Sequence, residues 1–369
     1  MMDFHMFALQ PGQDPLLKGA EVLETAQVKE NGELAISCKD IAAAARRIAP
    51  YANRTPVMTS TTLNERVFGT DSEGGTVFLK CENFQKVGAF KFRGACNAVF
   101  SQEKLPLAGF ITHSSGNHGQ ALALAGKLRK SPVTIVVPTG APKAKVDAMK
   151  GYGATIVESD PATRAEQTEK IAKESGAMII HPSNEPLVMA GQGTLMAEFW
   201  AQLSQMCDQD LQVMVVPVGG GGMLSGVAVA ARALIPNVYI IAAEPAIADD
   251  TARSKECGSM QDHRDGKVPE TIADGLRTTL GSNTWPIVRD LVNEVILVSE
   301  EEIIKAMHFV FERLKLVIEP SAAVGVAALL SNQFKQGYLK THPDTKNVGV
   351  VLCGGNLSLT ERLPFQNEM

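Results

Sequence analysis

Short apolar runs alternate with amphipathic stretches along most of the chain. The apolar runs are rich in β-branched residues and predict strands at 76–79, 109–112, 133–137, 155–157, 177–180, 212–216, 238–242, 294–297 and 348–352. Between them, the helical period predicts helices that include 120–128, 143–150, 164–174 and 301–315. Apolar strands separated by helices are typical of parallel sheets that are covered on both faces. The pattern therefore predicts the α/β fold class.

Residues 1–37 do not share this pattern. They show weak periodicity and contain an internal Pro-Gly, so we expect an N-terminal extension of uncertain order. The length of 369 residues suggests two domains of ordinary size, and a single domain stays open as the alternative.

Composition and charge narrow the class of partner. The formal net charge is -5, the sequence pI is near 5.9, and the chain contains no basic block. Nucleic acid and membrane surfaces are therefore not expected partners. The six cysteines form no C-x-x-C pair, and no apolar run reaches the roughly 18 residues of a transmembrane helix. Both features favour a cytoplasmic protein with reduced thiols.

A lysine between two phenylalanines is the first candidate for chemistry. Lys91 lies between Phe90 and Phe92, where the segment 80–94 leads from a predicted strand into a helix. Apolar surroundings destabilise the charged ammonium and make the amine a usable nucleophile toward a carbonyl. The other interpretation is a surface lysine whose stem covers the phenylalanines.

Two turns that follow predicted strands offer groups for binding an anion. Residues 112–120 (THSSGNHGQ) place small polar side chains at a helix start, which suits a carboxylate or phosphate, with an ordinary N-cap as the alternative. The strand predicted at 212–216 leads into Gly219, Gly220, Gly221 and Gly222. Successive N–H groups there can converge on a phosphate, with a flexible loop as the alternative. No Gly-Lys-Ser/Thr follows, so this is not a Walker loop.

Cys353 follows the last predicted strand and precedes Gly354, Gly355 and Asn356. Its thiol could face a ligand at the end of that strand. A single cysteine at a strand end is also typical of a small buried hydrophobic residue.

In this order, these segments resemble motifs of the fold-type II pyridoxal-phosphate (PLP) enzymes, in particular the serine racemase and serine/threonine dehydratase family. The resemblance covers about residues 38–362. It rests on KCENFQKVGAFKFRG, SSGNHGQ, HPSNEPLVMAGQGT, PVGGGGMLSG, AAEPAIADD, TIADG, TWPIVRDLV and IEPSAAVGVA. It implies two open, twisted, mostly parallel sheets with helices on both faces. The implied activity is racemisation of L-serine to D-serine, with β-elimination to pyruvate and ammonia.

The same resemblance implies a role for each residue of the site. Lys91 would carry PLP as a Schiff base, with Phe90 packed on the ring. Asn117 would bind the phenolic oxygen of the ring, and Cys353 would face the ring nitrogen. The phosphate would be held by the backbone of Gly219, Gly220, Gly221, Gly222 and Met223. The substrate carboxylate would lie among Ser115, Asn117 and His118, and Ser115 would protonate Cα on the face opposite Lys91.

The resemblance also implies a divalent cation and, with weaker support, ATP. AAEPAIADD resembles the divalent-cation loop of the family, with the carboxylates of Glu244 and Asp250 and the carbonyl of Ala248 as oxygen ligands. Such ligands suit Mg²⁺, or Ca²⁺ or Mn²⁺, and an acidic surface loop is the alternative. ATP activation has weaker support, because Val87 and Ser183 stand where nucleotide-binding relatives usually carry Thr and Asn. A homodimer is also implied.

We expect a large PLP-binding domain made of 38–106 plus 187–369, and a small domain, 107–186, that closes over the substrate. The cofactor is expected in the cleft between them. Three alternatives stay open. One is a dedicated serine/threonine or hydroxyaspartate dehydratase, suggested by Cys353, because mammalian-type serine dehydratases place Cys where racemases usually place Ser. The others are an aspartate racemase and a PLP-binding protein without catalysis.

Overall fold

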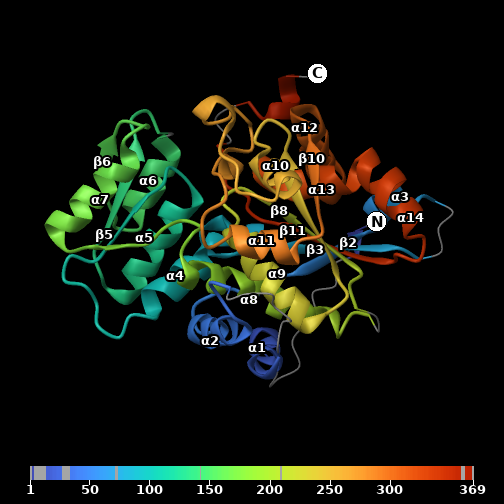
Figure 1. The fold of residues 1–369 in the computed structure, drawn as a ribbon, viewed down its shortest axis with the longest axis horizontal. Coiled ribbons are helices and arrows are strands. Elements are labelled where there is room, and N and C mark those ends of the chain that lie inside the picture. The colour runs from blue at the N-terminus through green and yellow to red at the C-terminus, as the bar shows by residue number, and fades with distance from the viewer. Residues whose placement is uncertain are drawn as a thin grey trace.

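We describe the fold from a computed structural model. The description covers residues 2–3, 14–26, 34–70, 74–141, 143–207, 210–358 and 362–367. Within these residues the strands form two sheets, one of seven strands and one of four. Figure 1 shows the four-stranded sheet with its helices on the left and the seven-stranded sheet to its right.

The larger sheet is mostly parallel. Its strands follow the order β1-β2-β3-β11-β8-β9-β10. They are β1 (Met2–Asp3), β2 (Val57–Ser60), β3 (Thr76–Cys81), β8 (Val213–Pro217), β9 (Tyr239–Pro245), β10 (Glu294–Val298) and β11 (Asn347–Leu352). β2 pairs antiparallel with β1 and β3, and the remaining neighbours are parallel. β8 and β11 are buried along their whole length, which explains why their sequences are apolar without alternation.

The smaller sheet is parallel throughout and has the order β6-β5-β4-β7. Its strands are β4 (Phe110–His113), β5 (Val133–Pro138), β6 (Thr155–Ser159) and β7 (Met178–Ile179).

All the strands expected from the apolar runs are present in the two sheets, with ends shifted by a few residues. The structure adds β1 and β2, and β9 continues beyond its expected end to Pro245.

Helices cover both faces of the sheets. Beside the smaller sheet lie α5 (Asn117–Arg129), α6 (Lys143–Gly151) and α7 (Arg164–Ser175). With the larger sheet lie α1 (Pro15–Thr25), α2 (Cys38–Ile48), α3 (Thr61–Phe68), α4 (Lys91–Phe100), α8 (Pro186–Leu203), α9 (Gly222–Leu234), α10 (Asp250–Cys257), α11 (Trp285–Leu291), α12 (Glu300–Phe309), α13 (Pro320–Leu330) and α14 (Leu339–Thr341). α8 and α9 pack on one face, and α12 and α13 lie on the other (Figure 1). No helix in the described ranges is long and apolar enough to cross a membrane.

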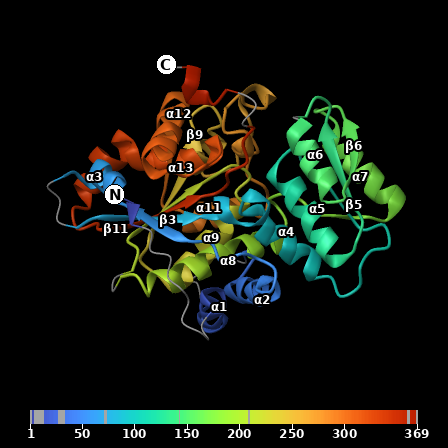
Figure 2. The same cartoon turned by 180° about the vertical axis from the view of Figure 1, so that it is seen from behind.

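Helix α1 lies inside the N-terminal segment for which the sequence predicts no definite order. It packs against α2 and α8 (Figure 2), and its Leu16, Ala20 and Leu23 are fully buried. Gly19 allows the close approach of α8, because an added Cβ would lie 2.3 Å from the carbonyl oxygen of Ala197. Part of residues 1–37 therefore belongs to the core around the larger sheet, whereas residues 1, 4–13 and 27–33 lie outside the description.

A buried ionic network joins α4 to β3 and α8. The guanidinium of Arg93 donates hydrogen bonds of 2.8 Å to both carboxylate oxygens of Glu82, and of 3.1 Å to both oxygens of Glu198. The amine of Lys80 donates to Glu198 at 2.6 Å. All four side chains are fully buried. Because each charge has an opposite partner, the network fixes the first turns of α4 without leaving a buried charge unpaired.

The parallel topology places several candidate residues along one edge. The segments after β3, β8, β9 and β11 leave the larger sheet at the carboxyl ends of its strands. Ligands of open α/β sheets bind at this edge. The glycine run follows β8 and Cys353 follows β11, so both lie there.

Candidate active site

Lys91 is the first residue of α4. The start of this helix is tied to the end of β11, because the Phe90 N–H donates to the Cys353 carbonyl at 3.1 Å. The Lys91 amine donates to the Pro182 carbonyl at 2.8 Å and lies 5.2 Å from the centroid of the Phe90 ring. Burial lowers the pKa of Lys91 to about 8, although nearby acidic groups raise it. A substantial fraction of this amine is therefore neutral and nucleophilic near physiological pH.

Two histidines near Lys91, His118 and His181, are kept neutral. His118 is buried, and its Nε2 lies 3.2 Å from the carbonyl oxygen of Ile180. Burial lowers the pKa of His118 well below its usual value and that of His181 to about 4, and it also lowers the pKa of His113. His181 Nδ1 accepts from two backbone N–H groups, at 3.2 and 2.9 Å, which requires it to be unprotonated. These rings can accept or donate single hydrogen bonds without adding positive charge beside Lys91.

Asn117 is the first residue of α5, and both polar atoms of its side-chain amide form hydrogen bonds. Its Nδ2 donates to the two carboxylate oxygens of Glu319, at 2.8 and 3.1 Å. Its Oδ1 accepts from Asn356 Nδ2 at 2.8 Å. The sequence pattern assigns no role to Glu319 or Asn356. The one signal at Glu319 is a carboxylate between an apolar run and a helix that begins at Pro320, where it is the N-cap of α13.

The glycine run forms a tight backbone turn between β8 and α9. An added Cβ would lie 2.4 Å from Ser183 Oγ at Gly220 and 2.7 Å from the Ser183 carbonyl oxygen at Gly222. At Gly219 it would lie 2.8 Å from backbone atoms of Leu276, and Gly221 has a φ of 78°. Only glycine fits this turn, which brings backbone N–H groups to the start of a 13-residue helix. Such a turn can cradle a phosphate.

Ser115 and Cys353 lie in neighbouring segments. Ser115 is half-buried in the turn between β4 and α5, two residues before Asn117. Cys353 is 2% exposed, and burial raises the pKa of its thiol well above the usual range. Cys353 is therefore a neutral thiol near physiological pH. Met223, in the first turn of α9, is also buried.

The acidic residues predicted to bind metal lie near the end of β9, with Glu244 inside the strand and Asp250 at the start of α10. Glu244 accepts from the N–H groups of Thr251 and Ala252, at 2.8 and 2.9 Å, and Asp250 accepts from that of Leu280 at 3.0 Å. Burial, together with the charge of Asp250, raises the pKa of Glu244 to about 8, and burial raises that of Asp250 to about 7. Within the described ranges there is no cluster of three or more His, Cys, Asp or Glu suited to a metal. Two adjacent buried carboxylates and the buried Ala248 backbone nevertheless offer oxygen donors only, as Mg²⁺ or Ca²⁺ requires.

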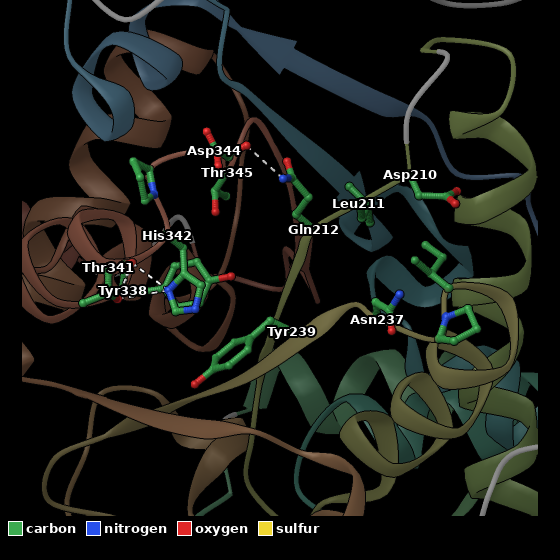
Figure 3. A pocket seen from close by; sticks show the side chains of 13 residues that line it. Asp210, Leu211, Gln212, Asn237, Tyr239, Tyr338, Thr341, His342, Asp344 and Thr345 are labelled. Carbon is green, nitrogen blue, oxygen red and sulfur yellow. Dashed lines mark hydrogen bonds between the residues drawn. The ribbon is translucent and has the colours of Figure 1, made fainter.

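A separate cavity of about 670 Å³ lies at the opposite edge of the larger sheet (Figure 3). Its lining includes Asp210, Leu211 and Gln212 before β8, and Tyr338 and His342, whose rings stack at 4.3 Å. These segments precede the strands, so the cavity opens at their amino ends. The cavity therefore does not belong to the Lys91 site, although large pockets are the usual first candidates for a binding site.

The family was established by comparison with known proteins. The sequence profile described as "Pyridoxal-phosphate dependent enzyme" matches residues 48–354, which is most of the chain. The chain belongs to this family. The PLP cofactor and the fold expected from the motifs are thereby confirmed. The roles of individual site residues remain predictions.

The most informative relatives of this PLP enzyme are racemases. Serine racemase of Arabidopsis thaliana is 48% identical over 316 residues, which cover 85% of this chain and 91% of the relative. Human serine racemase is 45% identical over 337 residues, which cover 89% and 94%. The structure of maize serine racemase aligns with a TM-score of 0.82 at 44% identity, covering 88% of this chain and 95% of that one. That of a PLP-dependent aspartate racemase also gives 0.82, at 38% identity, covering 90% and 99%.

The residues around Lys91 fit PLP chemically. A buried amine of lowered pKa is suited to bond the aldehyde carbon, and a turn in which only glycine fits is suited to the phosphate. Because the two oxygens that Asn117 Nδ2 contacts belong to one carboxylate, a single N–H hydrogen can serve both, and the second can be donated elsewhere. This site thus offers a nucleophile, an anion cradle and a neutral donor in one region.

Proposed function

We propose that this PLP enzyme interconverts L-serine and D-serine and also eliminates water from serine to give pyruvate and ammonia. The observation that carries the proposal is the half-buried Lys91 at the start of α4, whose amine donates to the Pro182 carbonyl and whose pKa is lowered by burial to about 8. Serine racemases that match nearly the whole chain support serine as the substrate. The chemistry therefore needs a base for the Cα proton and an acid on the opposite face.

Lys91 is the base in this proposal. When bound, PLP withdraws the electron pair left on Cα as its proton departs. Once the substrate amine has taken the place of Lys91 on the cofactor, the freed and neutral Lys91 amine would take that proton at Nζ. Ser115 Oγ then gives a proton to Cα from the other face, and the product is the enantiomer. Where the β-hydroxyl leaves instead, hydrolysis of the released enamine yields pyruvate and ammonia.

The remaining residues bind and orient in this proposal. The backbone of Gly219, Gly220, Gly221, Gly222 and Met223 holds the phosphate. Asn117 donates to the phenolic oxygen, Phe90 packs on the ring, and the Cys353 thiol faces the ring nitrogen. The substrate carboxylate lies among Ser115, Asn117 and His118, where the neutral His118 keeps Nδ1 buried without a hydrogen-bond partner in the described structure.

One assay tests the two activities together. Purified protein is incubated with PLP, Mg²⁺ and L-serine, and D-serine is followed by chiral separation while pyruvate is measured in the same tube. We expect both products in the unchanged protein. Ser115→Ala should abolish D-serine and leave pyruvate. Pyruvate without any D-serine from the unchanged protein would contradict the racemase proposal and favour a dehydratase.

A dedicated dehydratase is the second candidate function. The observation that favours it is Cys353, a buried thiol that is kept protonated and therefore is a weak donor. The structure of a threonine deaminase from T.th. aligns with a TM-score of 0.79 at 37% identity. Aspartate is a further substrate to test, because an aspartate racemase aligns as well as the maize enzyme does. L-threonine and L-aspartate belong in the same assay.

We further propose that Glu244, Asp250 and the Ala248 carbonyl hold Mg²⁺, Ca²⁺ or Mn²⁺. A divalent cation would stabilise both carboxylates in their charged form, which burial disfavours. Raised thermal stability on adding Ca²⁺, absent in Asp250→Asn, is the expected result. ATP has less support, because Val87 and Ser183 depart from the nucleotide-binding pattern. Titration with ATP in the serine assay decides this point.

Residues 107–186 are proposed to form a small domain that closes over the substrate. An ion pair between Lys145 of α6 and Asp274, in the short helix Asp274–Leu276, supports this proposal, because it joins the smaller sheet's helices to the larger part. A cytoplasmic location and a homodimer are proposed alongside. Light scattering of the purified protein tests the dimer.

A further inference from the structure

Glu319 is a buried carboxylate at the centre of the site that the mechanism above does not use. It is 4% exposed and lies between the start of α13 and the glycines that follow Cys353. Its carboxylate accepts from Asn117 Nδ2 at 2.8 and 3.1 Å and from the Asn356 N–H at 3.3 Å. An added Cβ at Gly354 would lie 2.5 Å from Glu319 Oε1, so the carboxylate is packed closely on this segment.

The hydrogen bonds around Asn117 leave its amide a single orientation. The Val87 carbonyl can only accept, and it accepts from Asn356 Nδ2 at 2.7 Å. The nitrogen of Asn356 therefore also faces Asn117, whose oxygen accepts from it at 2.8 Å. This directs the nitrogen of Asn117 toward Glu319. An ionised carboxylate can only accept, so it reinforces the same direction from the other end.

The Val87 end of this series of hydrogen bonds is itself held in place. Val87 has a φ of 57°, which is unfavourable for a β-branched residue, and Gly88 has a φ of 70°. The turn is held by the Gly355 N–H, which donates to the Gly88 carbonyl at 2.9 Å, and by Asn356. The two ends of the chain are thus an anchored carbonyl and a buried carboxylate.

From this geometry we propose that Glu319 is a positioning residue, which fixes the amide nitrogen of Asn117 so that one N–H hydrogen remains for the phenolic oxygen of PLP. This inference rests on the proposed function of the site, because Asn117 acts on the cofactor there. Both oxygens of one carboxylate lie on the same side of the Asn117 nitrogen and share one hydrogen. The second hydrogen is left for another acceptor. A glutamine at 319 can donate as well as accept, so the direction of the Asn117 amide would then be set from the Val87 end alone.

The charge of Glu319 also acts on Lys91. Its carboxylate raises the pKa of the Lys91 amine, against the larger effect of burial. Burial raises the pKa of Glu319 itself to about 7. The groups that face this carboxylate from the surrounding elements are Asn117 of α5, Asn356 and Cys353 after β11, Lys91 of α4, Asp274 of the helix Asp274–Leu276, and Lys145 of α6.

The test compares Glu319→Gln with unchanged protein as holoenzymes. Borohydride reduction followed by peptide mass spectrometry reports whether PLP is attached to Lys91. Absorbance of the visible cofactor band is titrated against pH, and serine turnover and thermal stability are measured. Glu319→Gln should retain the attached PLP, lower the pH midpoint of the band by about one unit, and reduce kcat at least about tenfold. A residue with only a structural role would change thermal stability without moving the midpoint.

Two further variants sharpen the result. Glu302→Gln removes an exposed carboxylate that accepts from the Ser299 N–H at the start of α12, so it controls for the loss of one negative charge at a helix start away from the site and should leave the midpoint unchanged. Glu319→Asp keeps the charge and shortens the side chain, so its midpoint should stay near that of the unchanged protein while kcat falls. If Glu319→Gln does not fold, Glu319→Asp serves as the test in its place. An unchanged kcat in Glu319→Asp would then overturn the inference.

The outcomes separate this inference from the function on which it rests. Unchanged protein without PLP on Lys91 would overturn both. PLP attached to Lys91 in the unchanged protein and in Glu319→Gln, with equal midpoints and equal kcat, would overturn the role of Glu319 alone.

Discussion

The amine of Lys91 donates a 2.8 Å hydrogen bond to the carbonyl oxygen of Pro182. Pro182 lies between β7, the last strand of the smaller sheet, and α8, which packs with the larger one. The proposed nucleophile is therefore tied to the segment that connects the two sheets. This contact orients the amine before any cofactor arrives.

Capture of PLP by the cofactor-free protein should depend on the protonation of Lys91. Only the neutral amine attacks the aldehyde, and burial lowers the pKa of this amine to about 8. The capture rate should therefore rise about tenfold for each pH unit below 8 and level off above it. Stopped-flow absorbance measures this profile. A rate still rising steeply near pH 10 would show an ordinary exposed lysine, and Lys91→Ala should form no adduct.

Gly222→Ala should weaken the binding of PLP. The added Cβ would lie 2.7 Å from the backbone oxygen of Ser183, so the turn must shift and the phosphate loses aligned N–H groups. We expect the Kd for PLP to rise at least about tenfold, which corresponds to about 1.4 kcal/mol. Gly337→Ala is the matched control, because its Cβ meets no atom within 4 Å. Equal affinity in the two variants would argue against a phosphate site at this turn.

Leu23→Ala tests whether α1 belongs to the core. Leu23 is fully buried, whereas its neighbour Val22 is 37% exposed on the same helix. Leu23→Ala should lower the free energy of unfolding by about 2 to 5 kcal/mol, and Val22→Ala by much less. Urea unfolding followed by circular dichroism gives both values. A small effect of Leu23→Ala would mean that α1 detaches readily from α8.

Removing one charge from the buried network should be costly. Glu198→Gln leaves Lys80 and Arg93 with one fewer anion and should lower the free energy of unfolding by about 3 to 5 kcal/mol. Glu301→Gln, which breaks the exposed pair with Lys305, should change it far less. Denaturant unfolding at pH 7 compares the two, and similar losses would contradict the prediction.

The contribution of this network to the stability of the folded state should depend on pH. Burial alone raises the pKa of Glu198, but the charges of Arg93 and Lys80 outweigh burial and lower it to about 2. A carboxyl whose pKa is lowered by folding stabilises the folded state above its unfolded pKa, which is about 4.3. This stabilisation should be lost as the pH falls from about 4 toward 2.

Cys353→Ser should shift the balance between the two products. A hydroxyl is a stronger hydrogen-bond donor than the thiol, which burial keeps protonated. We expect the ratio of D-serine to pyruvate to rise by several-fold, with PLP still bound. The combined chiral and pyruvate assay measures this ratio. No change in the ratio would show that the residue does not contact the ring nitrogen.

Local patterns predict much of this fold, because β8 and β11 are buried on both faces and their apolar runs are unambiguous. The sequence predicts the glycine turn equally well, since four successive glycines at a strand end favour a tight backbone turn. The sequence does not predict the role of Glu319 or the packing of α1, because both depend on contacts between segments that are far apart in the sequence. Glu319 gains its partners from α5 and from the segment after β11, far away in sequence. The contact of Gly19 with Ala197 likewise depends on how distant helices meet.

The short segment from Ile180 to Asn184 serves several neighbours at once. Its carbonyls contact His118 and Lys91, and Ser183 fills the space beside Gly220 and Gly222. Asn184 accepts a hydrogen bond from the Asn283 N–H at 2.8 Å. In evolutionary terms, we expect substitutions here to be strongly epistatic. A residue exchanged from a relative at position 183 alters the fit of the glycine turn as well as its own contacts. Changes at this segment should therefore persist only together with compensating changes in the glycine turn, α4 or α5.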